Sequence, residues 1–297
     1  MKSKARIFFI IFFFSLVASI VISPLRGGYV TIGPLTGFYL SSIVGLLTFF
    51  SLTIWTLSKY RCKLSSIYII TALFLGLSIL IAPLHIVDFV STLGSFLEYL
   101  IQVFAIILGC IVHLCKLKKT RIIISIAGIA FGLWLSYPGY EMWLNKVSHG
   151  TFTGQINNSK IYDFQFQTAE GDEVSLKTFE GKYLLIDHWY TYCGVCYRKF
   201  PKVQEVFDKY KDNPNVSIIA IHSRLEDKEE TYSTGKKILE GEGYSFPCYS
   251  INMKNPILKD LDVNGYPTVL IFDPESKLVF RGSIDFAEKY LKTIFEK

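Results

Sequence analysis

The sequence predicts an α-helical membrane domain of about five transmembrane helices, followed by an α/β domain. Three observations support this division. Long apolar runs fill residues 1–147, which carry 12 Lys and Arg against three acidic residues. Residues 148–297 carry 19 Lys and Arg against 22 acidic residues, and their apolar segments are short. A Cys-x-x-Cys pair lies in this polar half, directly after one such apolar segment.

Several apolar segments of the first half approach the length of about 20 residues that a helix needs to cross a bilayer. They lie near residues 7–25, 37–57, 65–87, 94–115 and 122–138. The first is either a retained helix or a signal peptide. Its length, and the lack of a clear small-x-small cleavage site, favour a retained helix. We therefore expect a transmembrane domain over 1–144 and a linker containing Gly, Asn and Ser over 145–160.

The charges between these segments predict an orientation. Lys and Arg cluster at 2–6, 59–63 and 116–121. The positive-inside rule places these clusters in the cytoplasm, and five crossings then carry the second half to the outer side. The sequence thus predicts a multi-pass protein of a bacterial plasma membrane with a periplasmic or other extracytoplasmic C-terminal domain. A miscount of one span would reverse this location. The overall charge of +6 comes from the membrane half and does not indicate nucleic-acid binding.

Segments of the second half alternate between strand and helix patterns. We expect strands at 163–167, 173–176, 183–189, 216–222, 246–251, 268–273 and 278–281, and helices at 200–210, 227–241 and 286–295. The strand segments alternate apolar and polar residues or form short apolar runs, and the last helix has apolar residues at helical spacing. This order predicts an α/β domain over residues 161–297.

Cys193 and Cys196 follow a predicted buried strand and precede a predicted helix. Free N–H groups and the helix dipole stabilise a thiolate at a helix start. A cysteine there has a pKa of roughly 3.5–7.5, against about 8.5 when it is free. Zinc binding is the alternative, but a tetrahedral zinc site needs four ligands, and this domain has no second Cys or His pair. The pattern therefore indicates redox chemistry.

Separated motifs, in the right order, carry a resemblance to a known family. The run from Ile186 to Cys196, then Pro201, then Gly265-Tyr266-Pro267-Thr268 resembles thioredoxin. Asp163-Phe164, Leu176, Gly181-Lys182 and the insert before Phe246-Pro247 resemble its TlpA/ResA branch of membrane-anchored extracytoplasmic thioredoxins. The resemblance covers about residues 160–297, and it implies a thioredoxin fold for that half of the chain.

The resemblance implies catalytic roles for three residues. Cys193 would be the exposed attacking thiol and Cys196 the more buried resolving thiol, and the two would form a redox-active disulfide. The Cys193 thiolate would attack a substrate disulfide, and Cys196 would resolve the mixed disulfide. Asp187 matches a buried aspartate beneath the pair, where desolvation raises the pKa of the carboxyl and lets it exchange a proton with Cys196. The alternative is an aspartate that caps a strand end or faces solvent.

Four further residues are expected to surround a bound substrate. Pro267 resembles the family's cis-proline, and a cis bond would let the backbone of Tyr266 pair with a peptide strand. An ordinary turn proline is the alternative. Trp189 and Tyr192 are expected to pack around and shield the cysteine pair, or else to be plain core aromatics.

The sequence departs from the family pattern at Val195 and Lys199, two positions close to the cysteine pair that are expected to influence its redox potential. Between the cysteines, Gly194 is followed by Val195 in place of the usual proline, and this dipeptide tunes the potential. Lys199 stands where some members carry a glutamate, and a cation there favours a thiolate. Cys248, in an apolar strand, is expected to be a buried inert thiol, with pairing to another protein as the alternative.

These inferences predict a membrane-tethered thiol–disulfide oxidoreductase that reduces protein disulfides outside the cytoplasm, for example in cytochrome c maturation or envelope redox homeostasis. Its partners would be disulfide-containing or dithiol proteins and a thiol electron donor, in the membrane or soluble, with no metal, organic cofactor or nucleic acid. Two alternatives stay open. One is a thioredoxin-fold module whose cysteines serve binding or redox sensing, and the other is a conduit whose membrane helices feed electrons to the outer pair.

Overall fold

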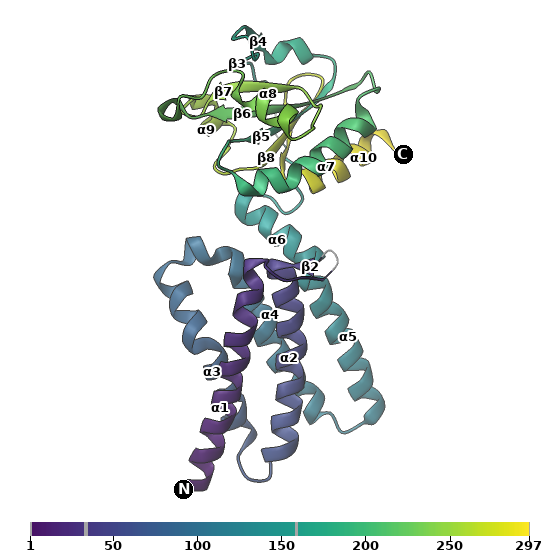
Figure 1. Cartoon of the computed structure of the whole chain (residues 1–297). Helices are drawn as coiled ribbons and strands as arrows, with labels where there is room; N and C mark the ends of the chain where they lie inside the picture. The colour runs from purple at the N-terminus through teal and green to yellow at the C-terminus, as the bar shows by residue number, and fades with distance from the viewer. Residues whose placement is uncertain (1, 33–34, 158–159, 297) are drawn as a thin grey trace. The chain divides into compact units, whose positions relative to one another are not determined.

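The computed structural model describes residues 2–32, 35–157 and 160–296. The chain divides into two compact units, Met1–Trp143 and Leu144–Lys297. Long helices make up the first unit, and a mixed β-sheet with helices on it makes up the second (Figure 1). The predicted order of a helical domain followed by an α/β domain is therefore confirmed.

Five helices in the described part of the first unit are long and apolar enough to cross a membrane. Within these spans lie α1 (Lys2–Ile22), α2 (Gly37–Tyr60), α3 (Ser66–Val87), α4 (Phe89–Leu114) and α5 (Lys118–Ser136). Helix α4 begins five residues before the predicted span, because the carboxylate of Asp88 caps it by accepting the N–H of Ser91 at 3.1 Å.

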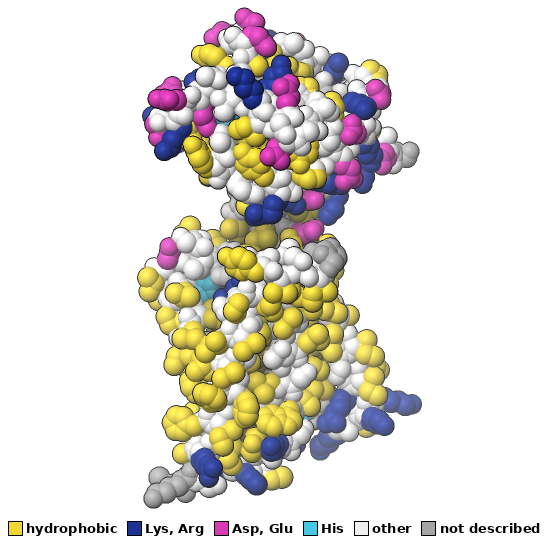
Figure 2. All heavy atoms as spheres, in the orientation of Figure 1, with side chains coloured by type: hydrophobic (Ala, Val, Ile, Leu, Met, Phe, Trp, Pro, Cys, Tyr) yellow, Lys and Arg dark blue, Asp and Glu magenta, His cyan; other side chains and the backbone are white. Residues whose placement is uncertain are grey.

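Hydrophobic side chains cover the visible surface of this unit, and Lys and Arg gather at the end where α1 begins (Figure 2). The exposed apolar residues include Phe9, Phe13, Ile67, Ile79 and Ile126. An apolar surface of this extent is typical of protein that faces lipid. The first unit therefore has the surface of a membrane protein as well as helices of the necessary length.

A buried ion pair lies inside the helical unit. Glu98 of α4 is fully buried, and its Oε2 lies 2.6 Å from Nε of Arg26 in the short helix η1 (Ser23–Gly27). Nε2 of Gln102, one turn further along α4, donates to Oε1 of Glu98 at 3.0 Å. Both carboxylate oxygens therefore have donors, and the pair links η1 to α4.

The segment 145–160, predicted to be a linker, is partly structured. Residues up to His149 belong to helix α6 (Pro138–His149), and Gln155 then forms a β-bridge with Phe280 of the sheet. Gly154 has a φ of +86°, and a Cβ there would lie 2.1 Å from the Phe280 ring, so a side chain could not be placed here without a shift. Asn158 and Ser159 of the predicted linker lie outside the described residues.

The sheet of the second unit has seven strands among the described residues, in the order β4-β3-β7-β6-β5-β8-β9. The strands are β3 (Gln165–Gln167), β4 (Glu173–Ser175), β5 (Tyr183–Trp189), β6 (Val216–Arg224), β7 (Cys248–Asn252), β8 (Thr268–Phe272) and β9 (Leu278–Gly282). The central strands β5, β6 and β7 run parallel, and the outer strands pair antiparallel. The short helix η2 (Leu176–Phe179) follows β4.

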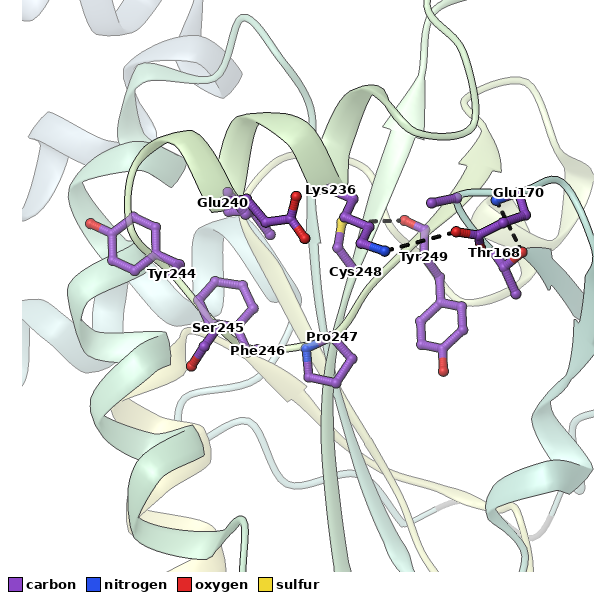
Figure 3. A pocket seen from close by; sticks show the side chains of 12 residues that line it. Thr168, Glu170, Lys236, Glu240, Tyr244, Ser245, Phe246, Pro247, Cys248 and Tyr249 are labelled. Atoms are coloured by element: carbon purple, nitrogen blue, oxygen red, sulfur yellow. Dashed lines mark hydrogen bonds and ion pairs between the residues drawn. The ribbon is translucent and has the colours of Figure 1, made fainter.

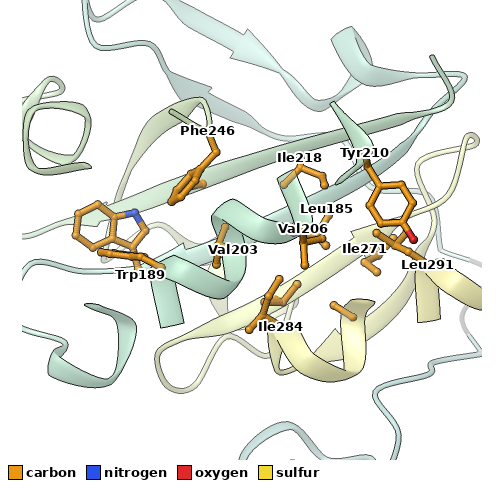
Figure 4. Packing of buried hydrophobic residues seen from close by; sticks show 14 of the residues in the cluster. Leu185, Trp189, Val203, Val206, Tyr210, Ile218, Phe246, Ile271, Ile284 and Leu291 are labelled. Atoms are coloured by element: carbon orange, nitrogen blue, oxygen red, sulfur yellow. The ribbon is translucent and has the colours of Figure 1, made fainter. Parts of the chain in front are cut away.

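Helices cover the sheet and bury two apolar clusters. They are α7 (Gly194–Tyr210), α8 (Thr234–Gly241), α9 (Pro256–Asp260) and α10 (Ile284–Phe295). Leu185 of β5 packs with Val203 of α7 and Leu291 of α10 in one cluster (Figure 4). The next residue along the strand, Ile186, belongs to the second cluster with Leu258 of α9. This alternation of side chains along β5 builds a core on each face of the sheet.

The predicted helix 227–241 is too long. Helix α8 begins only at Thr234, and a turn of 3-10 helix η3 (Glu226–Lys228) and Glu229 at a φ of +56° precede it. The Thr234 hydroxyl accepts the N–H of Thr231 at 2.9 Å, as a side chain does in a capping box, and this bond favours a helix start here. Helix α9 was not predicted, although Asn255 as its cap and Pro256 as its first residue are helix-start signals.

Candidate active site

Cys193 and Cys196 form a disulfide at the start of α7, with an Sγ–Sγ distance of 2.02 Å. Cys193 is the N-cap of this helix, and its Sγ accepts the backbone N–H of Cys196 at 3.1 Å. Cys193 is 6% exposed, whereas Cys196 is fully buried. The N–H groups of the first helical turn therefore lie beside the one cysteine of the pair that reaches the surface.

Asp187 lies on β5 beneath this helix. Strand alternation places its side chain on the same face of the sheet as Leu185 and Trp189, which pack in one cluster with Cys196. Asp187 is 1% exposed, and its Oδ1 has no hydrogen-bond partner among the described residues. Burial raises the pKa of this carboxyl from 3.8 to about 8. The group is therefore mostly protonated at neutral pH and can release a proton within the physiological range.

His188 faces the opposite side of the sheet from Asp187. It is fully buried, and neither ring nitrogen has a hydrogen-bond partner among the described residues. Burial lowers the pKa of His188 to about 3, so the imidazole is neutral at neutral pH. It is a packed histidine that lies outside the proton path of the cysteine pair.

Trp189 packs in the core beside the cysteine pair, which agrees with both of the positions expected for it, a residue around the pair or a core aromatic. It is fully buried, and its ring packs edge-on against Phe200 at 5.0 Å and Tyr197 at 6.1 Å. The strand carries its indole into the core between the sheet and α7 (Figure 4).

The remaining residues of the expected substrate site lie nearer the surface. Tyr192, next to Cys193, is 61% exposed. Tyr266 is partly buried, its ring centroid lies 5.1 Å from that of Tyr190, and the Tyr266–Pro267 peptide bond is cis. These groups belong to the two loops that precede α7 and β8.

The residues expected to tune the potential have different surroundings. Gly194 opens α7, and Val195 is 46% exposed. Lys199 donates through Nζ to Oδ2 of Asp285 on α10 at 2.6 Å. The neighbouring carboxylate offsets the charge of this lysine, which weakens the effect that we expected the cation to have on the thiolate.

Cys248 is half-buried at a pocket of about 290 Å³. The side chains of Lys236 and Glu170 also line the pocket, with Nζ and Oε1 3.8 Å apart (Figure 3). Burial of the sulfur raises the pKa of the Cys248 thiol to about 12. It is therefore protonated and a poor nucleophile at neutral pH, unlike a cysteine at a helix start.

The sequence did not single out a second buried polar group beside the cysteine loop. His222 of β6 lies next to Trp189, with their ring centroids 4.7 Å apart, and its Nε2 is 2.9 Å from Oγ1 of Thr191. Glu230 also approaches this nitrogen. Only the register between β5 and β6 brings Trp189 and His222 together, so no motif in the sequence could have indicated the contact.

A disulfide at a helix start accepts electrons from a thiol through a mixed disulfide, and the reduced cysteine pair donates them by the reverse exchange. The buried carboxyl on the same face of the sheet can exchange the protons that accompany those electrons. The second unit is therefore a thiol–disulfide oxidoreductase domain with a thioredoxin-like fold.

Comparisons with known proteins agree with this class. A family model described as thioredoxin-like matches residues 181–278. The thiol-disulfide oxidoreductase ResA of Bacillus thuringiensis subsp. konkukian is 30% identical over 187 residues, which cover 60% of this chain and 99% of that protein. ResA of Bacillus cereus is 29% identical, with the same coverage. This chain belongs to the ResA-like family of thiol-disulfide oxidoreductases.

A solved structure is also similar to the second unit. It is the thioredoxin domain of a thiol-disulfide oxidoreductase from Bacteroides vulgatus, with 20% identity and a TM-score of 0.40. The match covers 47% of this chain and 98% of that domain.

Proposed function

We propose that this protein is a membrane-tethered oxidoreductase that reduces protein disulfides outside the cytoplasm through Cys193 and Cys196. The observation that carries the proposal is the disulfide at the start of α7, with Cys193 the more exposed of the two cysteines and the buried carboxyl of Asp187 beneath the helix. Membership of the ResA-like family supports the direction of electron flow, from the cysteine pair to the substrate.

The reaction begins with the pair reduced. The Cys193 thiolate attacks one sulfur of a substrate disulfide, a bond forms between the two sulfurs, and the second substrate sulfur leaves as a thiolate that takes up a proton. Cys196 then attacks the Cys193 sulfur, the intramolecular disulfide forms again, and the first substrate sulfur leaves. Two electrons pass from the cysteine pair to the substrate, which leaves as a dithiol.

Asp187 serves the second step. Cys196 is fully buried and cannot lose its proton directly to bulk water. The ionised form of Asp187 accepts this proton, and a pKa of about 8 leaves that form present at neutral pH while keeping it basic enough to act. Once the exchange is complete, the carboxyl returns the proton to the departing thiolate or to water.

The cycle requires partners on both sides. A thiol donor, in the membrane or soluble, reduces the Cys193–Cys196 disulfide by the same exchange in reverse. The substrates are disulfide-containing proteins, with the oxidised haem-binding cysteines of apocytochromes c as one candidate and other envelope disulfides as another. Exposed Tyr192 and the loop at cis-Pro267 would receive such a polypeptide.

Two variants test the exchange. Cys193→Ser should lose turnover of a model disulfide by at least about 10³-fold, because it removes the nucleophile. Cys196→Ala should accumulate mixed disulfides with cellular proteins, because the resolving thiol is missing. Cys248→Ser is the matched control, and it should behave as wild type. Full turnover by Cys193→Ser, or no adduct with Cys196→Ala, would exclude protein disulfide exchange at this site.

A labelling experiment tests the location. The clusters of Lys and Arg at one end of the helical unit support a cytoplasmic position for that end (Figure 2). An impermeant thiol reagent should label Cys193 on intact cells treated with a reductant. Exposed Cys62, between α2 and α3, should be labelled only after lysis and serves as the control. The opposite pattern would reverse the proposed orientation.

A further inference from the structure

The loop that presents Cys193 contacts a buried histidine. Thr191 lies in this loop, after the end of β5 and two residues before Cys193, and its Oγ1 is 2.9 Å from Nε2 of His222. His222 is fully buried near the end of β6, where the strand register places it beside Trp189. The imidazole therefore joins the rigid centre of the sheet to the active-site loop.

A carboxylate from the insert between β6 and α8, residues 225–233, completes the group. The side chain of Glu230 is only 6% exposed, and its Oε2 lies 3.8 Å from Nε2 of His222. The same oxygen accepts the backbone N–H of Leu225 at 2.6 Å, which anchors the side chain at the base of the insert. Glu230 therefore lies in the interior although its neighbours in the chain are exposed, such as Glu229.

His222 is in its neutral form at neutral pH. Burial lowers its pKa to about 4, Glu230 acts in the opposite direction, and Arg224 on the same strand acts in the same direction as burial. Helix α8 packs Gly235 against the ring, since a Cβ there would lie 2.8 Å from His222 Cγ and 3.1 Å from the sulfur of Cys248. That thiol is itself uncharged at neutral pH, because burial raises its pKa.

A neutral imidazole carries a single N–H, and two features favour Nε2 as its position: the nearby carboxylate of Glu230 and the absence of a partner for Nδ1 among the described residues. An ionised carboxylate accepts hydrogen bonds only, so it favours the tautomer with the proton on the nearer Nε2. That N–H then donates to Oγ1 of Thr191 at 2.9 Å. Nδ1 of His222 has no partner in the part of the chain that the structure describes, so the tautomer with the proton on Nδ1 would leave a buried N–H unsatisfied.

We infer that His222 and Glu230 are positioning residues for the active-site loop: His222 holds Thr191, Glu230 favours this tautomer of His222, and together they set the position of Cys193 at the start of α7. The inference rests on the proposed exchange at Cys193. It adds a role for the insert, because a residue of that insert acts on the nucleophile through two intermediate side chains.

Thiolate chemistry gives a direct test. The reduced full chain, in detergent, is alkylated between pH 5 and 9, and modification of Cys193 is followed by mass spectrometry of its peptide. Thr191→Val keeps the size of the side chain and loses the hydroxyl. We expect it to raise the apparent pKa of the Cys193 thiol and to slow alkylation at pH 7 by about fivefold, which corresponds to loss of one partly buried hydrogen bond. Thr191→Ser restores the hydroxyl and should react within about twofold of wild type.

Glu230→Gln supplies a second and independent variant. It is nearly isosteric and can still accept the N–H of Leu225, but it loses the charge that favours a proton on Nε2, so it should shift the alkylation profile in the same direction as Thr191→Val and by a smaller amount. If Thr191→Val fails to fold, Glu230→Gln decides the question alone. An unchanged pH profile in the variants that fold, even with a lower melting temperature, would overturn the inference, as would Thr191→Ser reacting as slowly as Thr191→Val.

The readout is separate from the proposed function. Alkylation needs no protein substrate, so a shifted profile supports the positioning role even if no substrate protein can be trapped. Turnover of a model disulfide by the same variants then shows whether the position of Cys193 limits exchange, which should appear as a lower kcat with little change in KM.

Discussion

Each unit of this protein buries a carboxyl group, and the two groups have opposite surroundings. Glu98 in the helical unit is fully buried, and both of its oxygens have donors, Arg26 at 2.6 Å and Gln102 at 3.0 Å. Asp187 in the α/β unit is equally buried, but its Oδ1 has no partner among the described residues. A partnered carboxylate is costly to separate from its counter-charge, whereas an unpartnered carboxyl holds a proton that it can release.

The largest effect should come from breaking the partnered group. Glu98→Ala leaves the guanidinium of Arg26 in the interior without its counter-charge, and we expect a loss of about 3–5 kcal/mol in the free energy of unfolding. Denaturation of the full chain in detergent measures it. Glu98→Gln is the control, because it keeps an acceptor for Arg26 and should lose less. A loss below about 1 kcal/mol for Glu98→Ala would show that the pair is not structural.

Asp187 should make stability fall as the pH rises. Its pKa is raised from 3.8 to about 8 in the folded protein, so between these values the folded chain binds a proton that the unfolded chain has released. The stability due to this proton is fully present below about pH 4 and is lost progressively up to about pH 8. Asp187→Asn cannot ionise and should be more stable than wild type at pH 8, by on the order of 5 kcal/mol. Parallel pH profiles for the two proteins would contradict the raised pKa.

The same substitution should slow the chemistry. Without a carboxylate, Asp187→Asn has no group to accept the proton of Cys196, and resolution of the mixed disulfide should slow by about 10²-fold. Stopped-flow measurement of release of the second product thiol tests this step. Attack by Cys193 should keep its wild-type rate and serves as the internal control. If both steps slow equally, Asp187 acts on the whole site and not on Cys196.

Lys199 should have the smallest effect. It forms an ion pair with Asp285, but the two side chains are 39% and 37% exposed, so solvent screens the interaction. We expect Lys199→Ala to change stability by about 0.5 kcal/mol and the reduction potential of the pair by no more than about 10 mV. Lys202→Ala, which removes another paired lysine of the same helix, is the control. A shift above about 30 mV would give Lys199 a direct role at the thiolate.

The sequence predicted the parts of this protein that depend on local pattern. The spans of the helical unit follow from continuous apolar segments, and β5 follows from the buried run before Cys193, with the same bounds of 183–189. The position of Asp187 on the face beneath α7 follows from strand alternation once the neighbouring residues are known to be buried.

Other features depend on contacts between distant residues and were missed. The sequence left open whether Trp189 lies at the surface around the cysteine pair or in the core, because its full burial depends on the packing of α7 over β5. The helix predicted over 227–241 was too long, because Glu230 is drawn inward to the N–H of Leu225 and the region of His222. Helical propensity depends on local sequence and therefore does not predict the contacts of Glu230 with Leu225 and His222.

Residues 154–156, which precede the sheet in the chain, affect whether copies of this protein can associate through their sheets. Strand β9 is an outer strand, and an open edge can template pairing with a neighbouring chain. Here the edge is occupied, because Ile156 donates its N–H to Val279 at 2.9 Å and Arg281 donates to Gly154 at 2.8 Å. This pairing within the chain covers the β9 edge against another strand, and a side chain at Gly154, whose Cβ would clash with the Phe280 ring, would open that edge.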